Sequence, residues 1–292
     1  MRLKPGAPVL VREPGHVQVG LSRPLAFTDL AAEDRAFLAA LEGRRVSISS
    51  AERGRHARLI DDLGRHGLLE PARSAPTLPG LVRIRGVDPV TTWLAIGLAL
   101  AGVSALSIVD PARSIPARIP GSPGVGDARS LLRILKDASP SLRLASADEE
   151  SRIEILRGHG ASDLVLARTL TARDVPHLDV VTDEEGVDVG PLVVPGRTAC
   201  ETCLGIERAE RDPWWPRLAL QLGDPRRDAG LLVPAHAALV AAGVALREVL
   251  ASLDGREPAS VRWRIPYDSC LPEPTACQPH PACGCGAPTG AA

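Results

Sequence analysis

Four cysteines in two close pairs are the residues whose type and spacing most clearly predict chemistry. Cys200 and Cys203 are separated by two residues, and Cys283 and Cys285 follow 80 residues after Cys203 with one glycine between them. Each pair can close on one ion from a tight turn, and together they supply the four thiolates that tetrahedral Zn²⁺ prefers. A shared ion would fasten the C-terminal tail to the body of the domain. Because no open coordination position is evident, we expect a structural zinc site and not a catalytic one.

Other uses of these cysteines explain the pattern less well. A disulfide framework suits a secreted protein, but residues 1–5 do not form a charged segment followed by an apolar one, so we expect a cytoplasmic protein. A redox pair at Cys200 and Cys203 would leave Cys283 and Cys285 unexplained. Three further residues remain as substitute ligands or spare groups: Cys270, Cys277 and His280.

The composition is that of a soluble globular protein. The chain has 292 residues, of which 45% are hydrophobic and 24% charged, with a formal net charge of −1. This balance gives no support for bulk binding of nucleic acid. Residues 229–246 contain no Asp, Glu, Lys or Arg, but their alanines, proline and histidine favour a helix buried in a soluble core over a membrane span. We therefore expect neither nucleic acid nor membrane as a partner.

A proline-rich joint at residues 71–80 separates two different patterns along the chain. Before the joint, short extended segments are followed by helices, which predicts a small winged-helix-like α+β domain over residues 1–72, with a linker over 73–80. The expected strands cover residues 8–11, 16–21 and 25–27, and the expected helices cover 29–41 and 51–66.

After the joint, strands and helices alternate through a second domain over residues 81–292. This alternation is typical of an α/β protein with a doubly wound, mainly parallel sheet. We expect strands at residues 81–84, 105–109, 142–144 and 163–166, and helices at 90–101, 129–137 and 149–156. A hairpin over 179–189, the first cysteine pair, the apolar helix and a last strand at 261–264 complete the order.

The first strand–turn–helix of such a sheet usually carries the phosphate loop of a nucleotide site. A G-x-G-x-x-G loop lets the backbone approach pyrophosphate and points a helix N-terminus at its charge. Here Gly86 keeps the first glycine, but Asp88 and Thr91 occupy the second and third positions, and Asp88 would repel phosphate. Asp110 follows the next strand, where it is either a ribose-binding acid or a turn residue. The pattern predicts a dinucleotide-type fold whose nucleotide pocket has degenerated.

Several motifs of the second domain resemble the ThiF-type, ubiquitin-activating-enzyme-like adenylyltransferases. They are residues 101–111 (AGVSALSIVDP), 190–196 (GPLVVPG), 198–203 (TACETC) and the closing cysteine pair. Residues 195–204, 215–218 and 280–285 are more narrowly similar to divergent ThiF-like members found with thiazole/oxazole-modified peptide clusters. The resemblance extends over nearly the whole chain. It identifies residues 1–72 with the small clamp domain that binds the leader of a precursor peptide.

The resemblance also shows what this chain lacks. Active members place a lysine three residues after a glycine that opens a helix, whereas Gly126 and Arg129 hold these places here. They also carry a Mg²⁺-binding aspartate just after a strand that matches residues 163–170, where this chain has Leu170, which cannot ligate a hard cation. We therefore expect no adenylation and no bound ATP. The remnants of the nucleotide site would be Gly86, Asp110 and Arg129.

The resemblance implies a non-catalytic protein that presents a precursor peptide to a YcaO-type cyclodehydratase during synthesis of azole- or azoline-modified peptides. Relatives commonly form dimers, so a homodimer is a possibility. The leader would add a strand beside residues 25–27, with the helix over 51–66 as the other wall. The basic residues of this helix suit an acidic leader, or they simply form a solvent-exposed helix face. Leu25 and Phe27 share a face, which contacts the leader or joins the domain core. The expected peptide-binding residues are Leu25, Phe27, Arg55, Arg58, Leu59 and Asp62.

Two other functions stay open at this point. One is an ATP-dependent adenylyltransferase that activates a carboxylate through an unusual pocket. The other is a winged-helix DNA-binding regulator with a sensory C-terminal domain.

Overall fold

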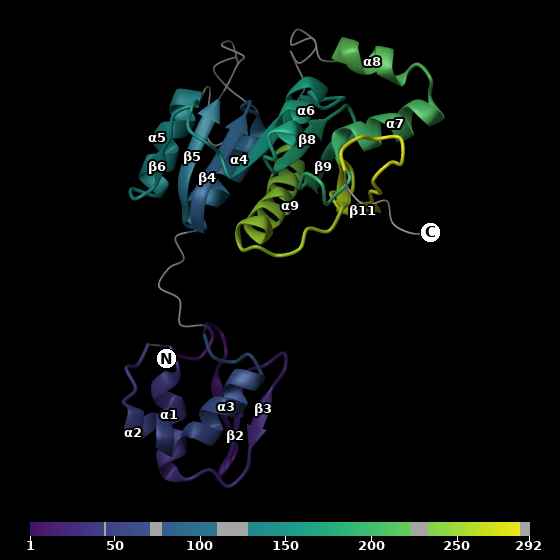
Figure 1. Ribbon diagram of the computed structural model, residues 1–292. Helices are drawn as coiled ribbons and strands as arrows, with labels where there is room; N and C mark the ends of the chain where they lie inside the picture. Colours follow the sequence, from purple (N-terminus) through teal and green to yellow (C-terminus); the bar gives the residue numbers. More distant parts are fainter. Residues whose placement is uncertain (44, 71–77, 110–127, 223–232, 287–292) are drawn as a thin grey trace. The chain divides into compact units, whose positions relative to one another are not determined.

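A computed structural model describes residues 1–43, 45–70, 78–109, 128–222 and 233–286. The chain divides into two compact units, Met1–Pro76 and Thr77–Ala292, and each is described by itself (Figure 1). Most of the expected linker lies outside the described residues.

The first unit is a three-stranded antiparallel sheet packed against three helices. Its strand order is β1-β2-β3, so among the described residues β1 and β3 are the two edges of the sheet. Side chains from the sheet, α1 and α3 share one core, in which Val19, Leu41 and Leu63 are fully buried. The strands precede the helices, as the sequence predicts. The elements are β1 (Val9–Glu13), β2 (His16–Val19), β3 (Leu25–Phe27), α1 (Ala32–Leu41), α2 (Ser50–Arg55) and α3 (Ala57–Arg65).

The single helix predicted over residues 51–66 is wrong, because the chain turns at His56 between α2 and α3. The His56 ring stacks on Phe37 of α1, with 4.1 Å between ring centroids. Its Nδ1 lies 2.6 Å from Oδ1 of Asp34, also on α1. These two contacts hold the imidazole against α1, and α3 begins directly after this residue. Since both partners lie about twenty residues earlier, local helical periodicity does not show the break.

The second unit contains an eight-stranded, mainly parallel sheet in the order β11-β10-β9-β8-β7-β4-β5-β6 (Figure 1). The run from β8 to β6 is parallel, whereas β9, β10 and β11 add antiparallel strands. The predicted α/β sheet and the hairpin, formed by β8 and β9, are thus confirmed. The strands are β4 (Leu78–Arg85), β5 (Val103–Val109), β6 (Arg143–Leu144), β7 (Ile153–His159), β8 (His177–Thr182), β9 (Gly186–Val193), β10 (Val261–Pro266) and β11 (Glu273–Ala276).

Helices cover both faces of this sheet. The larger core lies on the face that packs against α4 and α9. On the other face Leu156 of β7 packs against Leu170 of α6. The helices are α4 (Pro89–Leu100), α5 (Ala128–Ala138), α6 (Leu164–Ala172), α7 (Glu201–Arg211), α8 (Trp215–Leu222) and α9 (Ala235–Leu253).

By length and composition α9 could cross a membrane. Its alanine side is instead part of the core, with Ala237, Ala241 and Ala245 fully buried. Helix α4 approaches closely at Gly97, where an added Cβ would lie 2.9 Å from Leu246 of α9. This packing fits the buried core helix that the composition predicts.

Two neighbouring elements are the reverse of the sequence prediction. Residues 149–156 were expected to be a helix but lead into strand β7, and residues 163–166 were expected to be a strand but begin helix α6. Strand β7 is buried on both faces, so it lacks the alternation that marks a half-exposed strand. Asp163 caps α6 by accepting hydrogen bonds from the backbone N–H groups of Val165 and Leu166. A short apolar run does not distinguish these two structures by periodicity.

Candidate functional site

The four predicted cysteines come together at the start of α7. Cys200 is the N-cap residue of this helix and Cys203 lies in its first turn, while Cys283 and Cys285 approach from the tail. All four Sγ atoms lie within 4.8 Å of one another. Three Sγ–Sγ distances are 3.8 Å (Cys200–Cys203), 3.7 Å (Cys200–Cys283) and 3.7 Å (Cys203–Cys285). Ligands at the Zn–S distance of about 2.3 Å on a tetrahedron lie about 3.8 Å apart, so the geometry suits a metal ion.

The electrostatics of the cluster also favour a cation. Burial raises the pKa of Cys200 and Cys283, so free thiolates are disfavoured there. A divalent ion would offset this cost and hold all four sulfurs deprotonated. The cluster can therefore hold a metal ion, and its four sulfurs leave no open position for a substrate.

The three substitute ligands lie outside this cluster. The thiol of Cys270 donates to the Tyr267 carbonyl at 3.6 Å, and that of Cys277 donates to the Thr275 carbonyl at 3.6 Å. The Nε2 atom of His280 lies 3.1 Å from Glu210 Oε1, and its Nδ1 atom accepts a hydrogen bond from the backbone N–H of Ala282 at 3.1 Å. These contacts shape the tail that carries the second cysteine pair.

The degenerate phosphate loop is closed by its own side chains. The Asp88 carboxylate accepts from the Thr91 backbone N–H at 2.7 Å, and the Asp88 N–H donates to Thr91 Oγ1 at 2.9 Å. Asp88 Oδ2 also pairs with Arg157 Nε at 3.1 Å. At Gly86, where φ is +94°, an added Cβ would lie 2.9 Å from Cδ of Arg157. The donors that a phosphate would need at the N-terminus of α4 are thus partly occupied from within.

Arg157 is the residue of this arrangement that the sequence did not indicate. It lies 69 positions from Asp88 and reaches it from the adjacent strand β7. Among the expected remnants, Arg129 is exposed at the start of α5, and Asp110 lies outside the described residues. Nothing in the described residues brings Arg129 to Gly86.

The comparison that put Leu170 at the Mg²⁺-binding position of active members is wrong, because it assumed a strand where the chain forms a helix. Leu170 lies on helix α6, not after a strand, and it is 1% exposed against Leu156 and Ala167. The strand before α6 is β7, which ends at His159. The Nδ1 atom of His159 lies 3.1 Å from the Thr182 carbonyl oxygen. The identity of residue 170 therefore carries no argument about metal binding.

The expected peptide-binding residues differ in accessibility. Leu25 and Phe27 are half-buried and pack against the core of the first unit, and Leu59 belongs to that core with 5% exposure. Arg55 and Arg58 are exposed on α2 and α3. Asp62, also on α3, pairs with Arg65. Within the described part of the first unit, the accessible candidates are therefore the edge of β3 and the two arginines, whereas Leu59 belongs to the core.

No protein-family model matches this sequence, and a comparison with curated proteins gives no match. The fold does match solved structures. The microcin C7 biosynthetic enzyme MccB, in complex with N-formylated MccA, matches with a TM-score of 0.64 at 15% identity over 98% of this chain and 99% of that chain. E. coli MccB with ATP gives 0.63 at 14% identity over 97% and 98%. PaaA gives 0.57 at 14% identity over 94% and 99%. These similarities establish a shared fold and support the ThiF-like sheet expected from the sequence.

Proposed function

We propose that this chain binds the leader of a precursor peptide through its first unit and presents the peptide to a modifying enzyme. The observation that carries the proposal is the free edge of β3, in a unit that also displays Arg55 and Arg58. It is supported by the match of nearly the whole chain to MccB, a microcin C7 biosynthetic enzyme solved in complex with N-formylated MccA. In this reading the first unit is a winged-helix-like peptide clamp.

The two edges of the small sheet are not equivalent. On β1, the backbone N–H of Val9 donates to the Glu42 carboxylate at 3.1 Å, so a side chain already occupies part of that edge. Strand β3 pairs with β2 alone among the described residues. An added strand would gain main-chain hydrogen bonds along β3, and side-chain pockets would provide selectivity. Arg55 and Arg58 would attract acidic leader residues.

We assign the second unit a scaffolding role, with a structural zinc ion at the four cysteines. The closed loop around Asp88, Thr91 and Arg157 supports this role, because ATP would have to displace its internal contacts. The partner we propose is a YcaO-type cyclodehydratase that forms azoles or azolines. The proposal places this assembly in the cytoplasm and allows two copies of the chain in it.

A second candidate is an ATP-dependent adenylyltransferase. One structural neighbour was solved with ATP, and the objection based on Leu170 does not apply because that residue lies on a helix. ATP–pyrophosphate exchange with a precursor peptide would reveal this activity. The capped N-terminus of α4 makes the scaffolding role the better supported of the two.

Fluorescence polarisation with a labelled leader, encoded by a precursor gene beside this one, tests the proposal. Reversing both charges, Arg55→Glu and Arg58→Glu, should weaken binding of an acidic leader by about 1–3 kcal/mol, or roughly 5- to 150-fold in Kd. The loss should shrink as salt is raised, since both side chains are exposed. The matched control is Arg133→Glu with Arg217→Glu, two exposed arginines of the second unit. Equal effects of the two double variants would contradict leader binding at this surface.

A further inference from the structure

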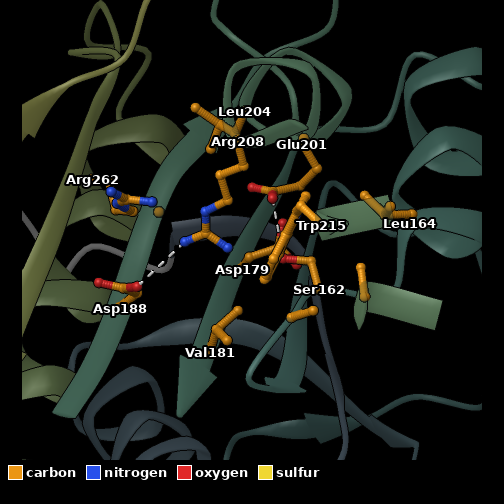
Figure 2. A pocket seen from close by; sticks show the side chains of 14 residues that line it. Ser162, Leu164, Asp179, Val181, Asp188, Glu201, Leu204, Arg208, Trp215 and Arg262 are labelled. Atoms are coloured by element: carbon orange, nitrogen blue, oxygen red, sulfur yellow. Dashed lines mark hydrogen bonds and ion pairs between the residues drawn. The ribbon is translucent and has the colours of Figure 1, made fainter. Parts of the chain in front are cut away.

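A small polar pocket lies on the face of the large sheet opposite the main core (Figure 2). It is bounded by β8, β9, α6, α7 and α8 and has a volume of about 30 Å³. A cavity needs roughly 10–15 Å³ to hold one water molecule, so this one has room for a small polar head group. The charged and polar residues that line it are Ser162, Asp179, Asp188, Glu201, Arg208 and Arg262.

Asp179 is the feature of this pocket that needs an explanation. Its side chain lies on the face of β8 opposite Leu178 and Val180, which belong to the main core, and the residue is 2% exposed. Neither carboxylate oxygen makes a well-formed hydrogen bond within the described residues, and Glu201 and Ser162 are the neighbouring polar side chains that act on it. Burial raises the pKa of Asp179 well above its usual range, and Glu201 raises it further. A buried carboxyl without a partner is costly, which points to a missing donor.

Among the described residues, the polar side chains nearest to Asp179 are mainly oxygen acceptors, and the two arginines of the pocket lie toward Asp188. Glu201 comes from the first turn of α7, and its Oε2 accepts from Ser162 Oγ at 3.1 Å. Arg208 is turned toward Asp188, with 3.9 Å between Nη2 and Oδ2, and lies over the Trp215 ring at 4.7 Å from its centroid. Figure 2 shows Arg262 on the same side of the pocket as Asp188, with the Arg208 guanidinium between Asp188 and Asp179. Asp179, Glu201 and Ser162 therefore bring oxygen acceptors together on one side of the pocket, and the charges of Arg208 and Arg262 on the other side favour an ionised Glu201.

We propose that this end of the pocket binds a primary alkylammonium group, with oxygens of Asp179, Glu201 and Ser162 as its acceptors. An ammonium group has three N–H donors, which matches the three acceptor groups. The volume suits an ammonium head better than a planar guanidinium, and the neighbouring arginines repel a single positive charge less than the two charges of a divalent cation. The apolar walls, Leu164, Leu204 and Trp215, suit an aliphatic stem. Such a group comes from a lysine side chain or from the N-terminus of a peptide.

This inference does not depend on leader binding by the first unit. It is tested on the full-length, ¹⁵N-labelled protein by following the indole N–H signal of Trp215, one of four tryptophans, which Trp215→Phe assigns. Nα-acetyl-lysine N-methylamide supplies the side-chain ammonium, glycinamide supplies an α-ammonium, and Nα-acetyl-norleucine N-methylamide supplies the stem without charge. We expect saturable binding of at least one amine, with Kd of roughly 1–10 mM, and no comparable binding of the norleucine probe. The amine that binds more tightly identifies the source of the group.

Variants then test which residues hold the amine. Asp179→Asn removes the carboxyl group that a bound ammonium would hold ionised and should weaken binding by at least about tenfold, whereas Asp137→Asn, an exposed aspartate on α5, should leave it unchanged. Ser162→Ala is an independent variant that leaves both carboxylates in place, and it is expected to weaken binding about tenfold. Equal binding of the norleucine probe, no binding of either amine, or full affinity in the variant tested would overturn the proposal.

Discussion

Removing the ion from the four-cysteine site should release the tail without unfolding the second unit. The cluster has its own small hydrophobic core, which includes Val193, Ala199 and Leu204 and is separate from the main core under α4 and α9. Ion binding at a free concentration a thousand times Kd contributes about 4 kcal/mol. For a unit of this size, 1 kcal/mol shifts Tm by about 2–4 °C. Chelation should therefore lower the Tm of the second unit by roughly 8–16 °C.

Calorimetry with and without a strong chelator measures this change, and metal analysis of protein purified without chelator identifies the ion. Cys285→Ser should reproduce the loss, because it removes one of the four ligands. Cys270→Ser is the matched control, since that thiol contacts the Tyr267 carbonyl outside the cluster. The melting of the first unit should not change. Protein with no bound metal, or a Tm that chelation leaves unchanged, would refute the reasoning.

Two further predictions concern the second unit. Calorimetry should detect negligible binding of Mg·ATP, and Asp88→Gly with Thr91→Gly should not create it; micromolar binding by the unmodified protein would overturn this expectation. Asp179→Asn should stabilise the protein by about 1–3 kcal/mol at pH 8. The pKa of Asp179 is raised in the folded protein. The wild-type protein therefore loses stability as pH rises above the ordinary aspartate pKa of about 3.9, and the asparagine variant does not. The gain should shrink toward pH 4 in urea unfolding, and an equal gain at both pH values would contradict it.

The features that the sequence predicted well depend on local chemistry or on regular alternation. The spacing within each cysteine pair predicted that both of its sulfurs could bind one ion, and the four sulfurs do lie together in the structure. This prediction depended on the spacing within each pair and not on the fold between the pairs. The three strands of the first unit and the β8–β9 hairpin were also predicted close to their observed positions. In these cases turn residues and apolar patterns lie next to one another in the chain.

The features that the sequence did not predict depend on contacts between distant residues. The sequence predicted a helix where β7 forms and a strand where α6 forms. A strand that is buried on both faces has neither a helical nor an alternating hydrophobic pattern, so periodicity does not identify it. The break at His56 depends on Asp34 and Phe37, and the closure of the phosphate loop depends on Arg157.

Hydrogen exchange of the full-length protein, with and without the leader peptide, tests the central claim most directly. If the leader adds a strand to the first unit, the backbone amides of β3 (Leu25–Phe27) and its flanking residues should exchange more slowly when the peptide is bound. Strand β1 (Val9–Glu13) serves as an internal control, because it is the other edge of the same sheet and Glu42 occupies part of it. The account predicts protection at β3 with little change at β1. Protection confined to β1 or to the second unit, with β3 unchanged, would contradict it.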